Sequence, residues 1–164
     1  MTIAAIDDPS TMTIYVDSSV LVAIYVPERF SDAARSSVRA AGPVPFTALH
    51  QLEVSNAFEL LVGRKQIKRS ECRAIQAHLH GDVRDHRLVV VTLDLDEVFA
   101  EASELSRLHA ARRLARSLDL LHVAAAHVAQ CTTFVSADDR QLAVAKASGL
   151  ATIDVKRRSA LAGY

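Results

Sequence analysis

The chain has 164 residues, of which 50% are hydrophobic, and its 19 basic and 19 acidic residues give a formal net charge of +0. This length suits one compact domain with a sizeable core, and the composition excludes a disordered protein. The balanced charge excludes a uniformly basic surface, so any contact with nucleic acid has to be local. No segment comes near the ~20 uninterrupted apolar residues of a membrane span.

Apolar runs typical of buried strands alternate along the chain with segments of helical periodicity. This alternation predicts an α/β fold, a three-layer α/β/α sandwich around a central, mainly parallel sheet of five strands. In such sheets, sites form at the carboxyl ends of the strands. In chain order, we expect strands at Thr13–Val16, Val44–Thr47, Leu88–Thr92, Thr133–Ser136 and Ala151–Asp154, and helices at Ser18–Val26, Ser31–Ala41, Ala48–Arg64, Ser70–Val83, Asp94–Ala110, Ser117–Ala129 and Asp139–Ser148.

The N-terminal residues and the two cysteines indicate the domain organisation and the cellular compartment of the chain. Residues 1–12 lack the basic start of a signal peptide, so we expect a short, flexible extension followed by one domain over residues 13–164. Cys72 and Cys131 are isolated and form no metal-binding or disulfide pattern. Free, buried cysteines are typical of a reducing compartment, which predicts a cytoplasmic protein.

The first and fourth expected strands both run into aspartates. Asp17 follows Val16 directly, and the pair Asp138–Asp139 follows Ser136 after one residue. Helix capping is the alternative role, because Asp is common at that position. Two strands that end in the same way favour a shared site at the sheet edge. Asp138 is nearer to its strand, so Asp139 is interpreted as a helix cap or an additional outer ligand.

Two further carboxylates lie in helical segments with few charged neighbours. Asp119 stands before an apolar run, where interaction with the helix dipole is the alternative role. Glu53 has apolar and polar neighbours, and an exposed helix face is its alternative. If all four carboxylates meet, each pair at ~4 Å repels by about 4 kcal/mol at an effective dielectric of about 20, which calls for a cation. An all-oxygen site selects Mg²⁺ or Mn²⁺, whose natural chemistry is phosphodiester hydrolysis by an activated water.

Taken in order, the four acidic motifs resemble those of the PIN-domain family, and the resemblance covers nearly the whole chain from Thr13 onward. It departs at position 136, where Ser stands in place of the commoner Thr but keeps a hydroxyl. The motifs are Val16-Asp17-Ser18-Ser19-Val20-Leu21-Val22, Leu52-Glu53-Val54-Ser55-Asn56-Ala57, Leu118-Asp119-Leu120-Leu121-His122-Val123-Ala124 and Ser136-Ala137-Asp138-Asp139-Arg140-Gln141-Leu142.

Size and compactness are similar to those of VapC-type toxins of bacterial toxin–antitoxin pairs. The resemblance implies a metal-dependent endoribonuclease with RNA as substrate, a homodimer, and a cognate antitoxin protein that occupies the active-site groove. It implies Asp17, Glu53, Asp119 and Asp138 as catalytic residues. The implied ligands of Mg²⁺ or Mn²⁺ are Asp17, Asp119 and Asp138, with Asp139 as a further candidate.

Basic residues gather just before Asp119, where they could hold the RNA backbone or form a solvated helix face. Of these, Arg116 and Arg112 are assigned to substrate binding, together with the hydroxyls of Ser18 and Ser136. His122 follows Asp119 by three residues and shares its helix face. A buried core histidine is the preferred interpretation of His122, and a role in the site is the alternative.

Apolar helical faces over Ala48–Val62 and Ile67–Leu79 exceed what a small sheet needs. We expect a homodimer interface there, which could also provide the antitoxin groove. Two other functions stay open. One is a PIN-like module that binds RNA or protein with little catalysis. The other is a metal-dependent DNA nuclease or phosphatase, because the same cluster can attack either backbone, and only contacts such as those with a 2′-hydroxyl would decide.

Overall fold

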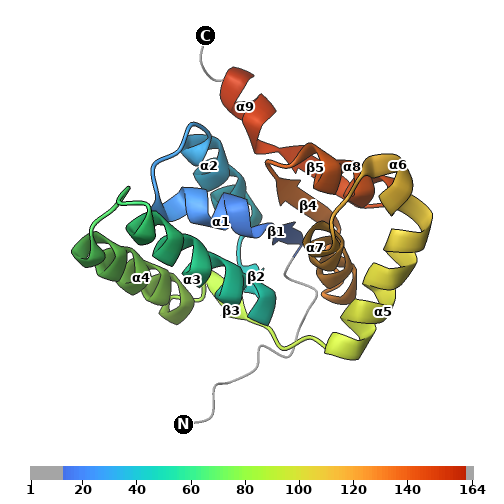
Figure 1. Ribbon diagram of the computed structural model, residues 1–164, viewed down its shortest axis with the longest axis horizontal. Helices are drawn as coiled ribbons and strands as arrows, with labels where there is room; N and C mark the ends of the chain where they lie inside the picture. The colour runs from blue at the N-terminus through green and yellow to red at the C-terminus, as the bar shows by residue number, and fades with distance from the viewer. Residues whose placement is uncertain (1–12, 162–164) are drawn as a thin grey trace.

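The structure is a computed structural model that describes residues 13–161, with two parallel sheets at its centre (Figure 1). The N-terminal extension expected over residues 1–12 lies outside the described residues. The first sheet has the strand order β1-β4-β5, and the second has the order β2-β3. The strands are β1 Ile14–Val16, β2 Val44–Phe46, β3 Leu88–Val90, β4 Thr133–Ser136 and β5 Ala151–Asp154.

The expected continuous five-stranded sheet is therefore corrected to two sheets, because no ladder of hydrogen bonds joins β1 to β2 within residues 13–161. The amide of Val44 donates to the carbonyl of Arg87 at 3.1 Å, so this side of β2 faces β3. The next amide position, which faces β1, belongs to Pro45, which has no N–H. On the opposite side of the gap, the carbonyl of Val16 accepts from His50 Nε2 at 2.8 Å. A proline and a histidine side chain thus stand where ladder bonds were expected.

Helices cover both faces of the β1-β4-β5 sheet, which agrees with the expected layered α/β architecture (Figure 1). Successive residues of a strand point to opposite faces. Accordingly, Ile14 and Val16 join a core with α1–α4, whereas Tyr15 joins a second core with α5, α7 and α8. The helices are α1 Ser18–Tyr25, α2 Ser31–Ala41, α3 Ala48–Gly63, α4 Arg69–Arg84, α5 Leu95–Leu105, α6 Ala111–Arg113, α7 Ser117–Val128, α8 Asp139–Ala147 and α9 Val155–Leu161.

The observed elements agree closely with the expected ones, except in two places. The helix expected over Asp94–Ala110 is divided into α5, a π-helical segment Ser106–Ala110 and α6, after which Leu114 has a φ of 53°. Helix α9 was not expected, because its polar sequence lacks a clear hydrophobic period. Asp154 caps this helix by accepting from the amide of Lys156 at 2.9 Å.

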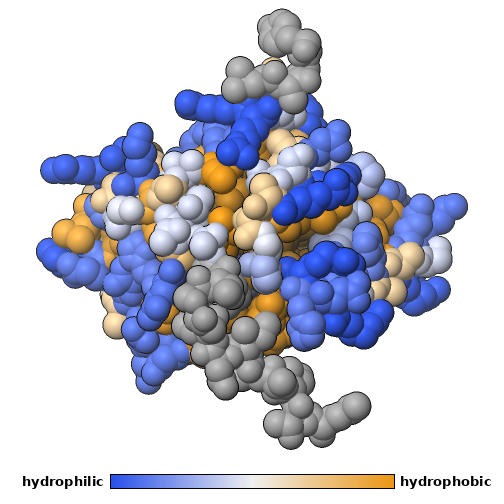
Figure 2. Space-filling model, turned by 180° about the vertical axis from the view of Figure 1, so that it is seen from behind, coloured by the Kyte–Doolittle hydropathy of each residue, from blue (hydrophilic) through white to orange (hydrophobic). Residues whose placement is uncertain are grey.

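The surface has a mixed character. Figure 2 shows hydrophilic residues at both sides of the reverse face and hydrophobic residues along its middle. Of the helices within residues 13–161, none combines the length and the apolar character needed to cross a membrane. Both observations agree with the balanced composition of the chain.

A first prediction concerns His50, which is 0% exposed and also accepts from the amide of Thr47 at 3.1 Å through Nδ1. We expect His50→Leu to lower the free energy of unfolding by about 2–6 kcal/mol, because two buried backbone groups lose their partner at about 1–3 kcal/mol each. Urea denaturation measures the change. His80→Leu, at an exposed position of α4, is the control and should change stability by less than about 0.5 kcal/mol. Equal effects of the two substitutions would contradict this role of His50.

Candidate active site

All four carboxylates singled out in the sequence line one cleft of about 510 Å³. They reach it from different elements: Asp17 from the end of β1, Glu53 from α3, Asp119 from the first turn of α7 and Asp138 from the end of β4. The parallel pairing of β1 with β4 brings two of these positions to the same sheet edge. The remaining lining residues are Ser18, Ser19, Arg116, Ser117, Leu118, His122 and Gln141.

Asp17 both caps a helix and lines the cleft, so its position is compatible with both expected roles. Its Oδ1 accepts from the amide of Val20 at 3.0 Å, at the start of α1. The hydroxyls of Ser19 and Ser136 donate to the same carboxylate at 3.0 Å and 2.9 Å. The carboxylate is 3% exposed. Burial raises the pKa of Asp17 above its ordinary value, and these donors, together with the nearby imidazole of His122, offset the effect only in part.

Asp119 is connected to Asp17 through two side chains of the β4–α8 segment. Its Oδ2 accepts from the amide of Arg116 at 2.8 Å, and Gln141 Nε2 lies 3.5 Å from its Oδ1. Gln141 Oε1 in turn lies 2.9 Å from the hydroxyl of Ser136, the group that also reaches Asp17. Ser136 is 0% exposed and does not line the cleft, so its position suits support of Asp17 better than the substrate contact expected from sequence.

The aspartates after β4 have different surroundings. Asp138 lines the cleft and caps α8, where its Oδ1 accepts from the amide of Arg140 at 2.7 Å. Burial acts to raise the pKa of Asp138, but backbone hydrogen bonds and the nearby guanidinium of Arg140 outweigh it and lower the pKa. The side chain of Asp139 is 77% exposed and faces Lys156 at 3.6 Å, outside this cleft. Of the two, Asp138 is therefore the candidate residue.

Glu53 is held at the cleft by two neighbours. Its Oε2 accepts from the hydroxyl of Ser18 at 2.7 Å and lies 2.5 Å from Nε2 of His122. Burial acts to raise the pKa of Glu53, but its hydrogen bonds with His122 and Ser18 outweigh burial and lower the pKa. Ser18 lines the cleft, as expected for a substrate contact, although its hydroxyl is engaged by Glu53.

Sequence reasoning missed the contacts of His122 and Gln141 with the carboxylates. His122 is buried, as preferred for a core histidine, yet it also contacts Glu53. Its spacing from Asp119 was the one available signal, whereas nothing in the sequence pointed to Gln141. Of the basic residues, Arg116 lines the cleft and Arg112 does not.

The oxygen donors of the cleft fit a hard divalent cation, although not as the tight cluster expected from the sequence. Within residues 13–161, no three His, Cys, Asp or Glu side chains are arranged to hold a metal ion together. Asp17 and Asp119 are nevertheless 3% and 9% exposed, and neither has an ion-pair partner in that range. Mg²⁺ is commonly bound by one or two carboxylates and keeps several waters. These two buried aspartates without an ion pair among the described residues therefore fit Mg²⁺ or Mn²⁺ best.

Comparison with known families identifies the fold. The family model described as PIN domain matches residues 14–147, which include all four carboxylates of the cleft. This chain belongs to the PIN domain family. PIN domains are generally nucleases and typically use divalent metal ions such as Mg²⁺, which agrees with the oxygen-rich cleft of this PIN domain.

Solved structures support the fold of this PIN domain. FitAcB from Neisseria gonorrhoeae is similar with a TM-score of 0.59 and 16% identity, over 87% of this chain and 98% of that chain. PAE2754 from Pyrobaculum aerophilum is similar with a TM-score of 0.56 and 22% identity, over 92% of this chain and 89% of that chain. No curated protein matches the chain in sequence. At these identities, the likeness concerns the fold alone.

A second prediction follows from the raised pKa of Asp17. A carboxyl with a raised pKa loses its contribution to stability as the pH rises through the folded-state pKa, because the unfolded state ionises more easily. In EDTA at neutral pH, we expect Asp17→Asn to raise the free energy of unfolding by about 0.5–2 kcal/mol, as is common when a functional group is removed at a cost in activity. At about pH 3, where the unfolded carboxyl is also largely protonated, this gain should disappear.

Urea denaturation at both pH values, with EDTA or Mg²⁺, measures this difference. Mg²⁺ should stabilise the wild type and leave Asp17→Asn unchanged. Asp139→Asn, which removes an exposed carboxylate outside the cleft, is the control for the loss of one negative charge. If Asp139→Asn gave the same gain in stability, a special cost of burying Asp17 would be ruled out.

Proposed function

We propose that this PIN domain is a metal-dependent endoribonuclease that hydrolyses RNA phosphodiester bonds and acts as the toxin of a VapC-type toxin–antitoxin pair. The observation that carries the proposal is that Asp17 and Asp119, buried without an ion-pair partner in the described part of the chain, line the same cleft as Glu53 and Asp138. Free Cys72 and Cys131 accord with a cytoplasmic site of action.

Each of the four carboxylates has a proposed role. Asp17 and Asp119 hold Mg²⁺ or Mn²⁺, which when bound lowers the pKa of a water and neutralises charge on the phosphate. Asp138 completes the ligand set from the end of β4. Glu53 has one carboxylate oxygen, Oε1, without a protein partner among the described residues, so it can orient the attacking water and accept its proton.

Substrate binding is proposed for the rim of the cleft. Arg116 lines it next to Asp119 and is exposed, so its guanidinium can contact a phosphate of the RNA backbone. Arg112 lies on the short helix α6, where it can contact a more distant phosphate. A cognate antitoxin protein is proposed to occupy the same cleft and exclude RNA from it, as the resemblance to VapC-type toxins implies.

Cleavage assays test this activity directly. Purified protein freed of any antitoxin should cut structured RNA pools in Mg²⁺ or Mn²⁺, leave matched DNA intact and be inactive in EDTA. Asp17→Asn and Asp119→Asn should each lower the rate on the order of 100-fold or more, as expected for removing a group that stabilises transition-state charge. Asp139→Asn should retain the wild-type rate.

The outcomes separate the competing functions. Equal cleavage of DNA would support the DNA nuclease instead. Binding of Mn²⁺ without cleavage of any nucleic acid would support a PIN-like binding module. Cleavage that survives in Asp17→Asn and Asp119→Asn would overturn the assignment of the site.

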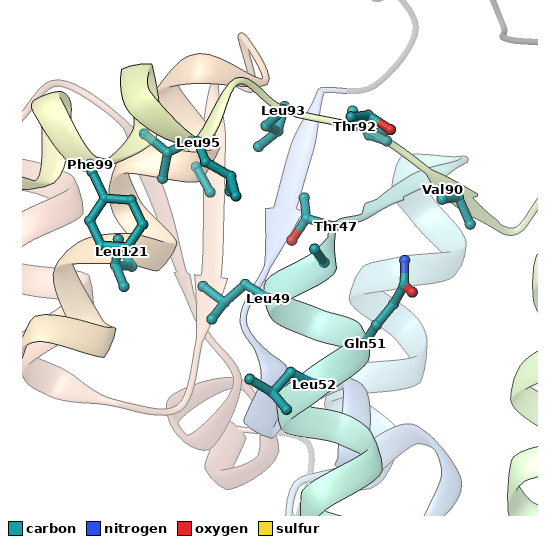
Figure 3. Close-up of a pocket in the computed structure, with 14 residues that line it drawn as sticks. Thr47, Leu49, Gln51, Leu52, Val90, Thr92, Leu93, Leu95, Phe99 and Leu121 are labelled. Atoms are coloured by element: carbon teal, nitrogen blue, oxygen red, sulfur yellow. The ribbon is translucent and has the colours of Figure 1, made fainter.

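The dimer interface is proposed at an apolar cleft of about 360 Å³ between α3 and the helices α5 and α7 (Figure 3). Leu52, Leu95 and Phe99 line this cleft and are 69%, 60% and 56% exposed. Large apolar side chains that are exposed together are typical of a protein interface. The other segment expected at the interface, Ile67–Leu79, turns its apolar residues into the core. The proposal therefore assigns a second copy of this chain to α3 and α5.

Light scattering coupled to gel filtration tests the interface. The wild type should be a dimer, and Leu52→Glu together with Phe99→Glu should be a folded monomer, because a charge at the centre of an apolar interface is desolvated without a partner. Leu114→Glu is the control, since Leu114 is 75% exposed and lies outside this cleft. A monomeric wild type, or a double variant that stays dimeric, would refute this interface.

A further inference from the structure

A chain of buried hydrogen bonds runs from the interior of the sheet to the cleft. It begins at Tyr15 in β1, which is 0% exposed, and its hydroxyl lies 3.1 Å from Nδ1 of His122. His122, which is 2% exposed, places Nε2 at 2.5 Å from Oε2 of Glu53. Two buried residues are thus connected to a carboxylate that lines the cleft.

The proton positions along this chain follow from the partners. The Tyr15 hydroxyl lies 3.1 Å from Nδ1 of His122, and the Thr47 side chain is a second hydrogen-bonding neighbour that acts to lower the pKa of Tyr15. Burial raises the pKa of Tyr15, so the phenol keeps its proton and needs an acceptor. When the phenol donates to His122, Nδ1 is the unprotonated ring nitrogen and the proton of His122 lies on Nε2. From there it is donated to Glu53, since a carboxylate only accepts.

The surroundings hold this arrangement rigid. The Tyr15 ring stacks on Phe134, with ring centroids 5.7 Å apart and planes 8° apart, and lies 4.8 Å from the ring of His50. His50 is itself fixed by the carbonyl of Val16. Burial lowers the pKa of His50 to about 3, so it adds no positive charge next to His122. The phenol therefore has little freedom to turn away from Nδ1.

We propose that Tyr15 and His122 are positioning residues that fix the tautomer of His122 and, through it, the orientation of the Glu53 carboxylate at the cleft. The inference rests on the proposed function of Glu53 in hydrolysis. With Oε2 held by His122 and Ser18, the other oxygen of Glu53 is kept in one direction for a water or substrate. Without the Tyr15 proton donor, His122 can place its proton on Nδ1, and its bare Nε2 would then face Glu53 Oε2.

A cleavage assay with two conservative variants tests this positioning. Tyr15→Phe should lower kcat on the order of 10-fold with KM unchanged, as is typical for loss of a group that orients an active-site residue. His122→Gln keeps an N–H donor near the Nε2 position and should retain more activity than His122→Leu. In a Glu53→Gln background, Tyr15→Phe should cause little further loss, because its effect passes through Glu53.

Two substitutions of the same chemical kind outside the cleft are matched controls. Tyr25→Phe removes a hydroxyl that donates to Asp82 at 2.6 Å, and His127→Gln alters a histidine that lies 2.7 Å from Glu101. Both should keep the wild-type kcat. The positioning role is wrong if Tyr15→Phe lowers kcat no more than Tyr25→Phe does. It is also wrong if Tyr15→Phe lowers kcat by the same factor in the Glu53→Gln background as in the wild type.

A spectroscopic measurement decides the inference separately from the proposed function. In metal-free protein labelled with ¹⁵N, His122 should show a protonated Nε2 and an unprotonated Nδ1, and Tyr15→Phe should give a mixture of both tautomers. The His122→Gln spectrum assigns the signals. A wild-type His122 protonated on Nδ1, or an unchanged tautomer in Tyr15→Phe, would overturn the inference. A wild type that shows the expected tautomers but cleaves no RNA would overturn the proposed function alone.

Discussion

The cleft depends on a carboxylate that the fold buries without an ion-pair partner among the described residues. Asp17 leaves β1 at the sheet edge, and its oxygens are held by the amide of Val20 and the hydroxyls of Ser19 and Ser136. These donors orient the carboxylate but bring no positive charge, so burial prevails and the pKa rises. A buried anion in this state is stabilised by a proton or a cation. Binding of a hard metal ion would offset the free-energy cost of burying this carboxylate.

At the carboxyl edge of the sheet, the same carboxylates cap helices and line the cleft. Asp17 caps α1 and Asp138 caps α8, and both line the cleft. Each strand of a parallel sheet ends where the next helix begins, so a capping aspartate there lies at the sheet edge as well. The β1–β4 register then brings the two caps to neighbouring positions. Capping and catalysis are therefore compatible roles for these residues.

Side chains of β1 point alternately to the two faces of the sheet, and this alternation connects the core to the cleft. Ile14 and Val16 face the core built with α1–α4, and Tyr15 faces the opposite side. There it packs among Phe134, His50 and His122, a layer of rings that combines dense packing with directed hydrogen bonds. The polar groups of this layer have partners, since no buried side-chain nitrogen or oxygen within residues 13–161 lacks one. Such a fully satisfied network favours one arrangement of Glu53.

The sequence by itself determined the local features of this protein. Helix and strand positions followed from hydrophobic period and from capping residues such as Asp17 and Asp138, because these depend on neighbours in the chain. The order of the four acidic motifs was readable for the same reason. Only the tertiary structure decided the break between β1 and β2, where the side chain of His50 bonds to the carbonyl of the distant Val16, and the contacts of Gln141 and His122 with the carboxylates. These contacts join residues far apart in the chain, and their partners are set by packing and register, which leave no local pattern in the sequence.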